Sequence, residues 1–344
     1  MKILGDKNNM LDILEKLINT VSVSGDEDEI SDVIRKLIKN YADEIKTDAL
    51  GNLIAVKKRA NAAPQAPKKI MIAAHMDEIG FIVTFIEDSG FIKISPVGGI
   101  DWTAVAFGEV LFKNGVRGVI VPEEKVKPND YKKDKFYIDI GAKDKSDAET
   151  KIKIGDICTV APKLTELMNN RIAASKLDNK IACVVLIKTL EKIKDFVTDN
   201  DLYFVFTSQE EVGLRGAKTA AQFIMPDYSI AVDVTDTGDT PDCTPMASKL
   251  GGGAAIKLMD RSVICHKDMI NLMMKIAKEK NIRYQSEIMV LGGTDTAVMQ
   301  SAGAGSIAGA ISIPSRYIHT GVEMCDMSDV QACVDLLSET LKKI

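Results

Sequence analysis

Hydrophobic positions recur with helical spacing at the start of the chain and form short clustered runs further along. Apolar residues at positions 10, 11, 13, 14, 17 and 18 share one face of a predicted amphipathic helix, and a second helix is predicted after Ser24-Gly25. Two apolar runs, at 51–57 and 69–74, predict strands. The stretch Ala60–Pro67 between them has the composition of a surface loop.

The pattern changes between Gly80 and about Lys163, where short β-rich runs alternate with glycine, proline and charged turns. Only one short helix is predicted there, at Ser146–Glu149, whose S-x-x-E pattern matches a capping box. The charged stretch Glu123–Lys135 is interpreted as a solvated loop. Several short strands with regular turns favour a small barrel or sandwich. The predicted strands are 81–86, 91–95, 109–112, 118–121, 136–140 and 156–160.

Helices and strands alternate again after Asn169, which predicts an α/β fold with a doubly wound, mostly parallel sheet. The β-rich block therefore interrupts an α/β domain. We predict a discontinuous α/β domain of residues 1–79 and 164–344, with an inserted domain of residues 80–163. The predicted helices are 179–194, 213–222, 267–280, one from 294, and 328–343; the strands are 202–207, 229–234, 285–290 and 308–313.

Composition narrows the class of protein. The chain has 344 residues, of which 46% are hydrophobic, and a net charge of −5. The negative net charge argues against a protein that binds nucleic acid mainly through a basic surface. No apolar run approaches the roughly 18 residues of a membrane helix, so no membrane partner is expected. The start MKILGDKNNM reaches charged and amide residues too soon for a signal peptide. Six scattered cysteines without a CxxC motif indicate a reducing compartment, so a cytoplasmic location is expected.

Metal-ligand side chains follow four predicted strands and begin one helix. Ligands of open α/β sheets bind at the carboxyl ends of the strands, so these side chains are expected to meet at one rim. Singly they have simpler explanations, such as a structural histidine or a helix N-cap; together they indicate a site. They are His75 and Asp77 after one strand, Glu210 and Glu211 after the next, then Asp233, His319, and Asp178 at the helix start.

Two imidazoles with several carboxylates suit Zn²⁺, Co²⁺ or Mn²⁺ better than Ca²⁺. Two ions about 3.5–4 Å apart need one shared carboxylate and two further ligands each, and a sixth carboxylate could act as general base. Adjacent Glu210 and Glu211 point in different directions in extended chain, which allows such a division of roles. Asp77 could accept the free ring N–H of His75.

Other chemistry-bearing residues are interpreted as structural. His266 lies at a helix start with no acidic strand end beside it. The glycine-rich stretches at Gly251–Gly253 and Gly292–Asp295 match no nucleotide-binding motif. For both we favour a close backbone approach near the site over simple turn chemistry.

Six segments resemble the glutamyl-aminopeptidase/tetrahedral aminopeptidase family of dinuclear metallopeptidases, in matching order over nearly the whole chain. The resemblance implies a phosphorylase/hydrolase-like α/β catalytic domain, a small β-barrel dimerisation domain at 80–163, and dimers that assemble into a hollow tetrahedral dodecamer. The segments are AAHMDEIGFIV, KLDNK, SQEEVGLRGA, AVDVTDTGDTP, GGTDTAVMQ and ISIPSRYIHTGVEM.

The resemblance also implies a role for each site residue. Asp178 would bridge two metal ions, Glu210 would be the general base, and Asp77 would support His75. The two terminal ligand pairs would be His75 with Asp233, and Glu211 with His319. The family removes N-terminal residues from peptides, and some members have carried a cellulase label.

Three departures from the family pattern stand out. Lys176 and Lys180 flank Asp178 where relatives commonly have alanine and arginine, and a threonine rather than serine follows His319. The inserted domain has no histidine near Pro122–Pro128, where relatives often have one. The missing histidine affects what is expected of the dimer contact, and it does not affect the expected catalytic residues.

We therefore expect a dinuclear aminopeptidase that acts on peptides with a free N-terminus and carries two divalent ions per subunit, with zinc or cobalt favoured and manganese as an alternative. A related metal-dependent deacylase is the alternative. An endoglucanase is less favoured, because the side chains of adjacent Glu210 and Glu211 are expected to diverge and one tryptophan offers little for sugar stacking. A catalytically silent scaffold would lack a ligand or base, yet all six positions are filled. The preferred N-terminal residue stays open.

Overall fold

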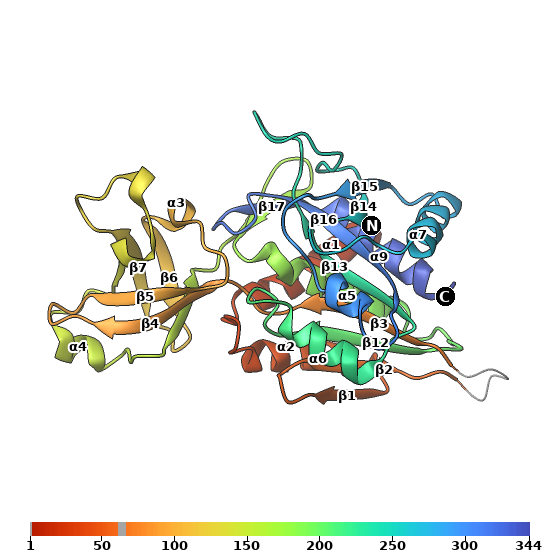
Figure 1. Ribbon diagram of the computed structural model, residues 1–344, viewed down its shortest axis with the longest axis horizontal. Coiled ribbons are helices and arrows are strands. Elements are labelled where there is room, and N and C mark those ends of the chain that lie inside the picture. The colour runs from red at the N-terminus through yellow and green to blue at the C-terminus, as the bar shows by residue number, and fades with distance from the viewer. Residues whose placement is uncertain (1, 61–66) are drawn as a thin grey trace.

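The computed structural model describes residues 2–60 and 67–344 and shows a large α/β unit from which a small β-barrel projects (Figure 1). The predicted α/β fold with a small barrel is confirmed. The predicted loop at Ala60–Pro67 lies, for residues 61–66, outside the described residues.

Helices account for both ends of the described chain. They are α1 (Lys2–Ile18), α2 (Asp28–Ile38), α3 (Trp102–Val105), α4 (Lys145–Glu149), α5 (Leu177–Lys192), α6 (Arg215–Ile224), α7 (Lys267–Glu279), α8 (Thr296–Gln300) and α9 (Met327–Leu341).

The strands form one open sheet and one barrel. Those of the sheet are β1 (Glu44–Thr47), β2 (Leu53–Lys57), β3 (Lys69–His75), β10 (Leu164–Glu166), β11 (Arg171–Ala174), β12 (Asp201–Thr207), β13 (Tyr228–Thr235), β14 (Ala254–Met259), β15 (Tyr284–Ile288), β16 (Ile307–Arg316) and β17 (Glu323–Asp326). Those of the barrel are β4 (Gly80–Ile86), β5 (Ile92–Val97), β6 (Gly108–Phe112), β7 (Arg117–Pro122), β8 (Phe136–Asp139) and β9 (Ile157–Val160).

The open sheet has a parallel centre. Its order is β1-β2-β12-β3-β13-β16-β17-β11-β10, with β14 and β15 added beside β16. The central strands β12, β3, β13 and β16 pair in parallel, while β2, β14 and β17 pair with them in antiparallel fashion. In the β12–β3 register, Thr207 pairs with His75, so the carboxyl ends of these two strands meet at one edge.

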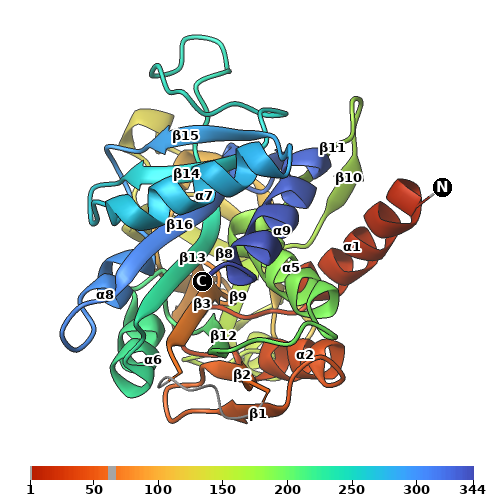
Figure 2. The ribbon, with the colours of Figure 1, turned by 90° about the vertical axis from the view of Figure 1, so that its right-hand side faces the viewer.

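Helices cover both faces of this sheet (Figure 2). On β13, Ile230 and Val232 belong to the core cluster formed with α1, α2, α5, α7 and α9, whereas Ala231 belongs to the cluster formed with α6 and α8. Successive side chains of a strand point to opposite faces, so a strand covered on both sides is apolar at consecutive positions. This double burial explains the continuous apolar runs of the central strands.

The barrel closes in the order β4-β5-β8-β7-β6-β9, and all its neighbouring strands are antiparallel. Phe81, Phe112 and Phe136 are buried in its core. The prediction of a single short helix here is wrong, because α3 also forms, capped by the Asp101 carboxylate that accepts the Thr103 N–H. The charged stretch contains two 3₁₀ turns, at 128–130 and 133–135, that bury no residue.

The cap of α4 also differs from the prediction. Asp144, in extended conformation, accepts the Asp147 N–H at 3.0 Å, and Ser146 lies inside the helix and donates its hydroxyl to Asp144 at 2.6 Å. A carboxylate at the N-cap accepts from the helix N–H groups and also opposes the positive end of the helix dipole, which favours Asp144 over a serine cap.

Five strands were not predicted: β1, β10, β11, β14 and β17. They are short and lie outside the parallel centre, and β17, with sequence EMCD, has little of the composition typical of strands.

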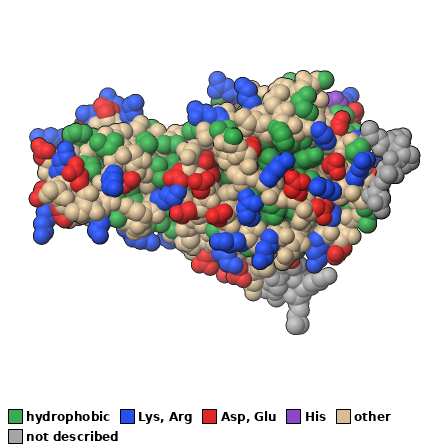
Figure 3. All heavy atoms as spheres, turned by 90° about the horizontal axis from the view of Figure 1, so that it is seen from below, with side chains coloured by type: hydrophobic (Ala, Val, Ile, Leu, Met, Phe, Trp, Pro, Cys, Tyr) green, Lys and Arg blue, Asp and Glu red, His purple; other side chains and the backbone are tan. Residues whose placement is uncertain are grey.

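None of the helices in the described ranges is both long and apolar enough to cross a membrane. Seen from below, acidic side chains gather near the middle of the molecule, with lysine and arginine side chains distributed around them (Figure 3).

Candidate metal centre

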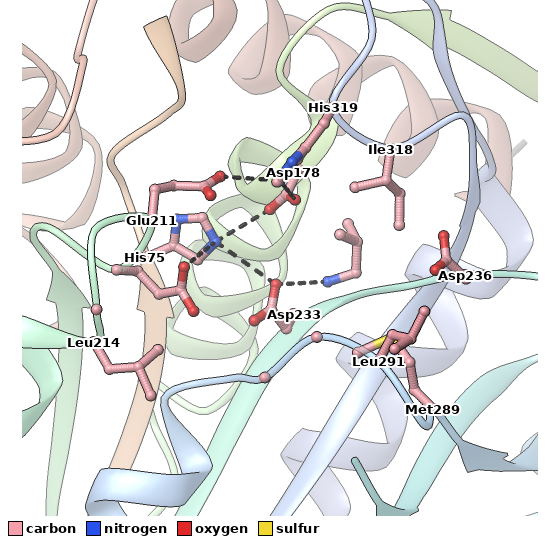
Figure 4. Close-up of a pocket in the computed structure, with 15 residues that line it drawn as sticks. His75, Asp178, Glu211, Leu214, Asp233, Asp236, Met289, Leu291, Ile318 and His319 are labelled. Atoms are coloured by element: carbon pink, nitrogen blue, oxygen red, sulfur yellow. Dashed lines mark hydrogen bonds and ion pairs between the residues drawn. The ribbon is translucent and has the colours of Figure 1, made fainter. Parts of the chain in front are cut away.

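The carboxyl ends of the parallel strands bring the predicted site residues together (Figure 4). His75 ends β3, Asp233 lies near the end of β13, and His319 follows β16. Glu210 and Glu211 lie in the turn after β12, and Asp178 lies at the start of α5, in a non-helical conformation. The peptide bond between Asp178 and Asn179 is cis. The rim predicted from strand ends is thus present in the structure.

Asp178 lies between the two histidines. Its Oδ1 is 3.1 Å from His75 Nε2, and its Oδ2 is 3.2 Å from His319 Nε2. On the first side, His75 Nε2 is 3.7 Å from Asp233 Oδ1; on the second, His319 Nε2 is 3.4 Å from Glu211 Oε1. Two groups of donor atoms, each within 4.8 Å of one another, therefore share Asp178.

The carboxylates of this cluster are crowded, and among the described residues their ion pairs are with the two histidines and with no lysine or arginine. Asp178 Oδ1 and Glu211 Oε1 are buried without a hydrogen-bond partner among the described residues. Burial raises the pKa of Glu211 and of Asp233, and nearby Asp178 adds to both shifts. Unpaired buried carboxylate oxygens beside two imidazoles fit a site for divalent cations, because such ions satisfy both kinds of donor.

The same acids raise the pKa values of the two histidines. Burial opposes the charged form of His319, but Asp178 and Glu211 outweigh it and raise its pKa to about 11. Burial likewise opposes protonation of His75, and the carboxylates of Glu210, Asp178, Asp233 and Asp77 raise its pKa well above the usual value. The surrounding carboxylates therefore favour positive charge at the position of both imidazoles.

Glu210 lies at the edge of the cluster, and its Oε2 is 4.0 Å from His75 Nε2. Burial raises the pKa of Glu210 well above the usual range, and the carboxylates of Asp233, Asp295 and Glu211 contribute. Asp77 contacts the other ring nitrogen of His75. Its Oδ1 is 3.5 Å from His75 Nδ1, and its backbone carbonyl oxygen is 3.3 Å from the same atom. Glu210 and Asp77 both therefore lie next to His75.

Glu323, at the start of β17, was missed by the sequence analysis. Its Oε2 accepts the Asp178 N–H at 2.8 Å, and its Oε1 accepts the His319 N–H at 2.9 Å. Only 3% of Glu323 is exposed, and burial raises the pKa of its carboxyl well above the usual range. One buried carboxyl thus ties together two site residues from different segments. The signal that could have identified it is an acid four positions after His319, between the apolar residues Val322 and Met324.

Two buried lysines flank Asp178 and share one acid. Lys176 Nζ is 3.3 Å from Glu78 Oε1, and Lys180 Nζ is 3.5 Å from Glu78 Oε2. Lys180 also donates to Ser22 Oγ and to the Met76 carbonyl. The lysines that distinguish this chain from the family pattern are therefore anchored through these contacts.

His266 and the two glycine-rich stretches differ in whether they lie near the metal centre. His266 caps α7, where its Nδ1 accepts the Asp268 N–H at 3.2 Å. Gly251 and Gly253 donate their N–H groups to Asp329, at 2.7 Å each, and do not line the cavity over the metal centre. Gly292 and Gly293 do line that cavity. Only the second glycine stretch therefore adjoins the site.

A second residue missed by the sequence analysis is Asp295, just after these glycines. It accepts the Thr207 hydroxyl at 2.6 Å, and its other oxygen is buried without a hydrogen-bond partner in the described part of the chain. Burial raises the pKa of Asp295 to about 7, with nearby Asp233 and Asp77 contributing. Its segment was noted only for its glycines and helix start.

A cavity of about 500 Å³ opens over the metal centre. The cluster forms one wall, and apolar side chains from three loops form much of the rest. The residues that line it beyond the cluster are Gly213, Leu214, Val234, Asp236, Met289, Leu291, Gly292, Gly293 and Ile318.

Comparison with known proteins gives consistent matches. A family model described as M42 glutamyl aminopeptidase matches residues 51–336. A protein of Acetivibrio thermocellus with a provisional aminopeptidase name is 48% identical over 98% of this chain and 99% of its own length. An aminopeptidase from Desulfurococcus kamchatkensis superposes with a TM-score of 0.93, at 35% identity, covering 98% of this chain and 96% of that one. The TET1 peptidase of Pyrococcus horikoshii, whose structure is described as a tetrahedron or large octahedral shell, superposes with a TM-score of 0.84, at 31% identity, covering 96% and 98%.

Proposed function

Because this chain belongs to the M42 glutamyl aminopeptidase family, we propose that it removes N-terminal residues from peptides by hydrolysis at a dinuclear metal centre. As a family member it is an aminopeptidase, a hydrolase that acts on peptides. The proposal concerns the metals, the roles of individual residues and the assembly.

The observation that carries the proposal is the position of Asp178. Its two oxygens face different histidines, each with its own second acid, which is the arrangement that a bridging carboxylate requires. His75 and Asp233 would hold one ion, and His319 and Glu211 the other. The mixed imidazole and carboxylate donors suit zinc or cobalt, with manganese as an alternative.

Bound divalent ions would supply Lewis acidity that polarises the scissile carbonyl and makes a water molecule a better nucleophile. Glu210 would take the proton of the attacking water and deliver it to the leaving amine. Its place beside His75, outside both donor groups that share Asp178, supports this role. Glu210 also forms a third group of donor atoms with His75 and Glu211, so the metal content of a Glu210 variant decides between base and ligand. The excess of carboxylates around the cavity suits a substrate with a free, cationic α-amine.

We further propose that residues 80–163 form a dimerisation domain on a catalytic domain of residues 1–79 and 164–344, and that dimers assemble into a tetrahedral dodecamer. The projecting barrel and the TET1 relative support this. A cytoplasmic location is supported by the six cysteines, all of which are free thiols. Light scattering of the purified protein measures the assembly directly.

One experiment tests the function: a panel of aminoacyl and N-acyl substrates combined with metal analysis of the same preparation. Hydrolysis of aminoacyl substrates that stops on chelation and returns with Zn²⁺ or Co²⁺ supports the proposal, as do about two ions per chain. Hydrolysis of N-acyl substrates alone would indicate a deacylase. Release of reducing sugar from cellulose in excess chelator would indicate an endoglucanase, and absence of both metal and activity a scaffold.

A further inference from the structure

The cavity wall away from the metal centre combines apolar side chains with one acid. Met289, Leu291 and Ile318 line it. In Figure 4, Asp236 lies across the cavity from His75 and Glu211, beyond Ile318 and Leu291. A side chain reaching from the metal centre toward Asp236 would therefore pass apolar surface before it meets a carboxylate.

The Asp236 carboxylate has no hydrogen bond or ion pair with any described residue, although its backbone carbonyl accepts the Ser248 hydroxyl at 2.6 Å. Asp236 is exposed as a residue, and partial loss of water around its carboxylate within the cavity raises its pKa, with nearby Asp178 contributing. A cation placed beside such a group forms a charge-assisted hydrogen bond, stronger than the same contact in open water.

All other charged groups of this cavity, apart from the two histidines, are acids of the metal centre, and no lysine or arginine lines it. Arg316 lines a neighbouring cavity that shares Asp236, but its guanidinium is bound to Asp239 through two contacts of 2.9 and 2.7 Å. An acidic side chain directed away from the metal centre would meet Asp236 and no available lysine or arginine among the described residues.

We propose that the enzyme prefers basic N-terminal residues, lysine or arginine, and that Asp236 is the specificity-determining residue. The proposal rests on the aminopeptidase function proposed above. The aliphatic stem of the substrate side chain packs on Met289, Leu291 and Ile318, and its terminal cation pairs with Asp236. The preference differs from the glutamyl specificity in the family's description.

The test compares aminoacyl substrates that differ only in the terminal group: lysine with norleucine, and glutamate with glutamine. The metal-loaded enzyme is expected to hydrolyse the lysyl substrate with a kcat/KM about 10-fold or more above that for norleucyl. The glutamyl substrate is expected to be poorer than the glutaminyl one. An equal or better norleucyl substrate, or a preference for glutamyl, would overturn the inference while leaving the aminopeptidase function intact.

Substitutions at Asp236 test whether this residue causes the preference for lysyl substrates. Asp236→Asn is expected to lower the lysyl-to-norleucyl ratio about 10-fold, and Asp236→Lys to favour glutamyl over lysyl substrates. Asp242→Asn, an exposed acid of the same loop that does not line the cavity, is the matched control and should keep the ratio of the parent enzyme. An unchanged ratio in Asp236→Asn would remove Asp236 from this role. Failure to hydrolyse any aminoacyl substrate would overturn the aminopeptidase function, and this inference with it.

Discussion

The Asp77 carboxylate accepts the backbone N–H of Glu210 at 3.0 Å. Its second oxygen accepts the N–H of Glu211 at 3.2 Å and the hydroxyl of Ser24 at 2.6 Å. Because Asp77 also lies beside His75, one carboxylate positions the proposed base and a proposed ligand of each ion. Its pKa is lowered, since the contacts with His75, Ser24 and these N–H groups outweigh burial.

Asp77→Asn is expected to lower kcat/KM or metal affinity about 10- to 100-fold, because an amide turns its NH₂ group toward one of the backbone N–H donors. Metal titration and steady-state kinetics on the same protein measure both effects. Ser24→Ala removes one hydrogen bond but leaves the carboxylate, so its loss should be much smaller. Equal losses in the two variants would show that the hydroxyl, not the carboxylate, is the important contact.

Glu210→Gln is expected to retain its metal ions and lose about 10²- to 10⁴-fold in kcat, because glutamine cannot accept the proton of the attacking water. Metal analysis and kcat on one preparation separate this role from ligation. Glu211→Gln is the informative comparison, since loss of a ligand should lower metal content as well. Near-normal turnover of Glu210→Gln would assign the base elsewhere.

Glu323→Gln is expected to weaken metal binding about 10- to 100-fold, because a neutral amide has one oxygen where two backbone N–H groups need acceptors. The loss should fall on metal affinity, and saturating metal should restore much of kcat. Glu149→Gln, an exposed acid on α4, is the control and should bind metal normally. A kcat defect that saturating metal leaves unchanged would contradict a positioning role.

Glu27 makes stability depend on pH. Burial raises its pKa from 4.5 to about 7, while its Oε1 accepts the N–H groups of Gly25 and Gln209. Since the folded-state pKa exceeds that of the unfolded chain, the stabilisation from protonated Glu27 is complete below about pH 4.5 and is lost as pH rises through 7.

Glu27→Gln should therefore be more stable than the parent protein at pH 8, by up to about 3 kcal/mol, with little difference near pH 4.5. Urea unfolding at both pH values measures the difference. Glu29→Gln, an exposed acid on the same helix, should show no such dependence. A gap of the same size at both pH values would indicate a packing effect instead.

The sequence predicted the parts of the site that follow from strand order. His75 and Asp233 end apolar runs that could only be central strands, and parallel pairing brings such ends together. Glu323 could not be found this way, because it acts through backbone N–H groups of residues distant in the chain. Asp236 and Met289 lie in loops that follow strands. The conformation of such loops depends on tertiary packing, which the hydrophobic pattern of the sequence does not predict. Two further strands were missed for a related reason: β1 and β17 are short and mix polar with apolar residues.

The strand order has a consequence for synthesis on the ribosome. β3 emerges before the barrel, but its partners β12 and β13 lie beyond it in the chain. All barrel strands pair among themselves within residues 80–160, so the barrel can complete its contacts while the parallel centre of the open sheet still lacks β12, β13 and β16. We expect the inserted unit to fold before its host, leaving the edge of β3 exposed until β12 has left the exit tunnel. During that interval the nascent chain is most exposed to aggregation, and chaperones would be most useful to it.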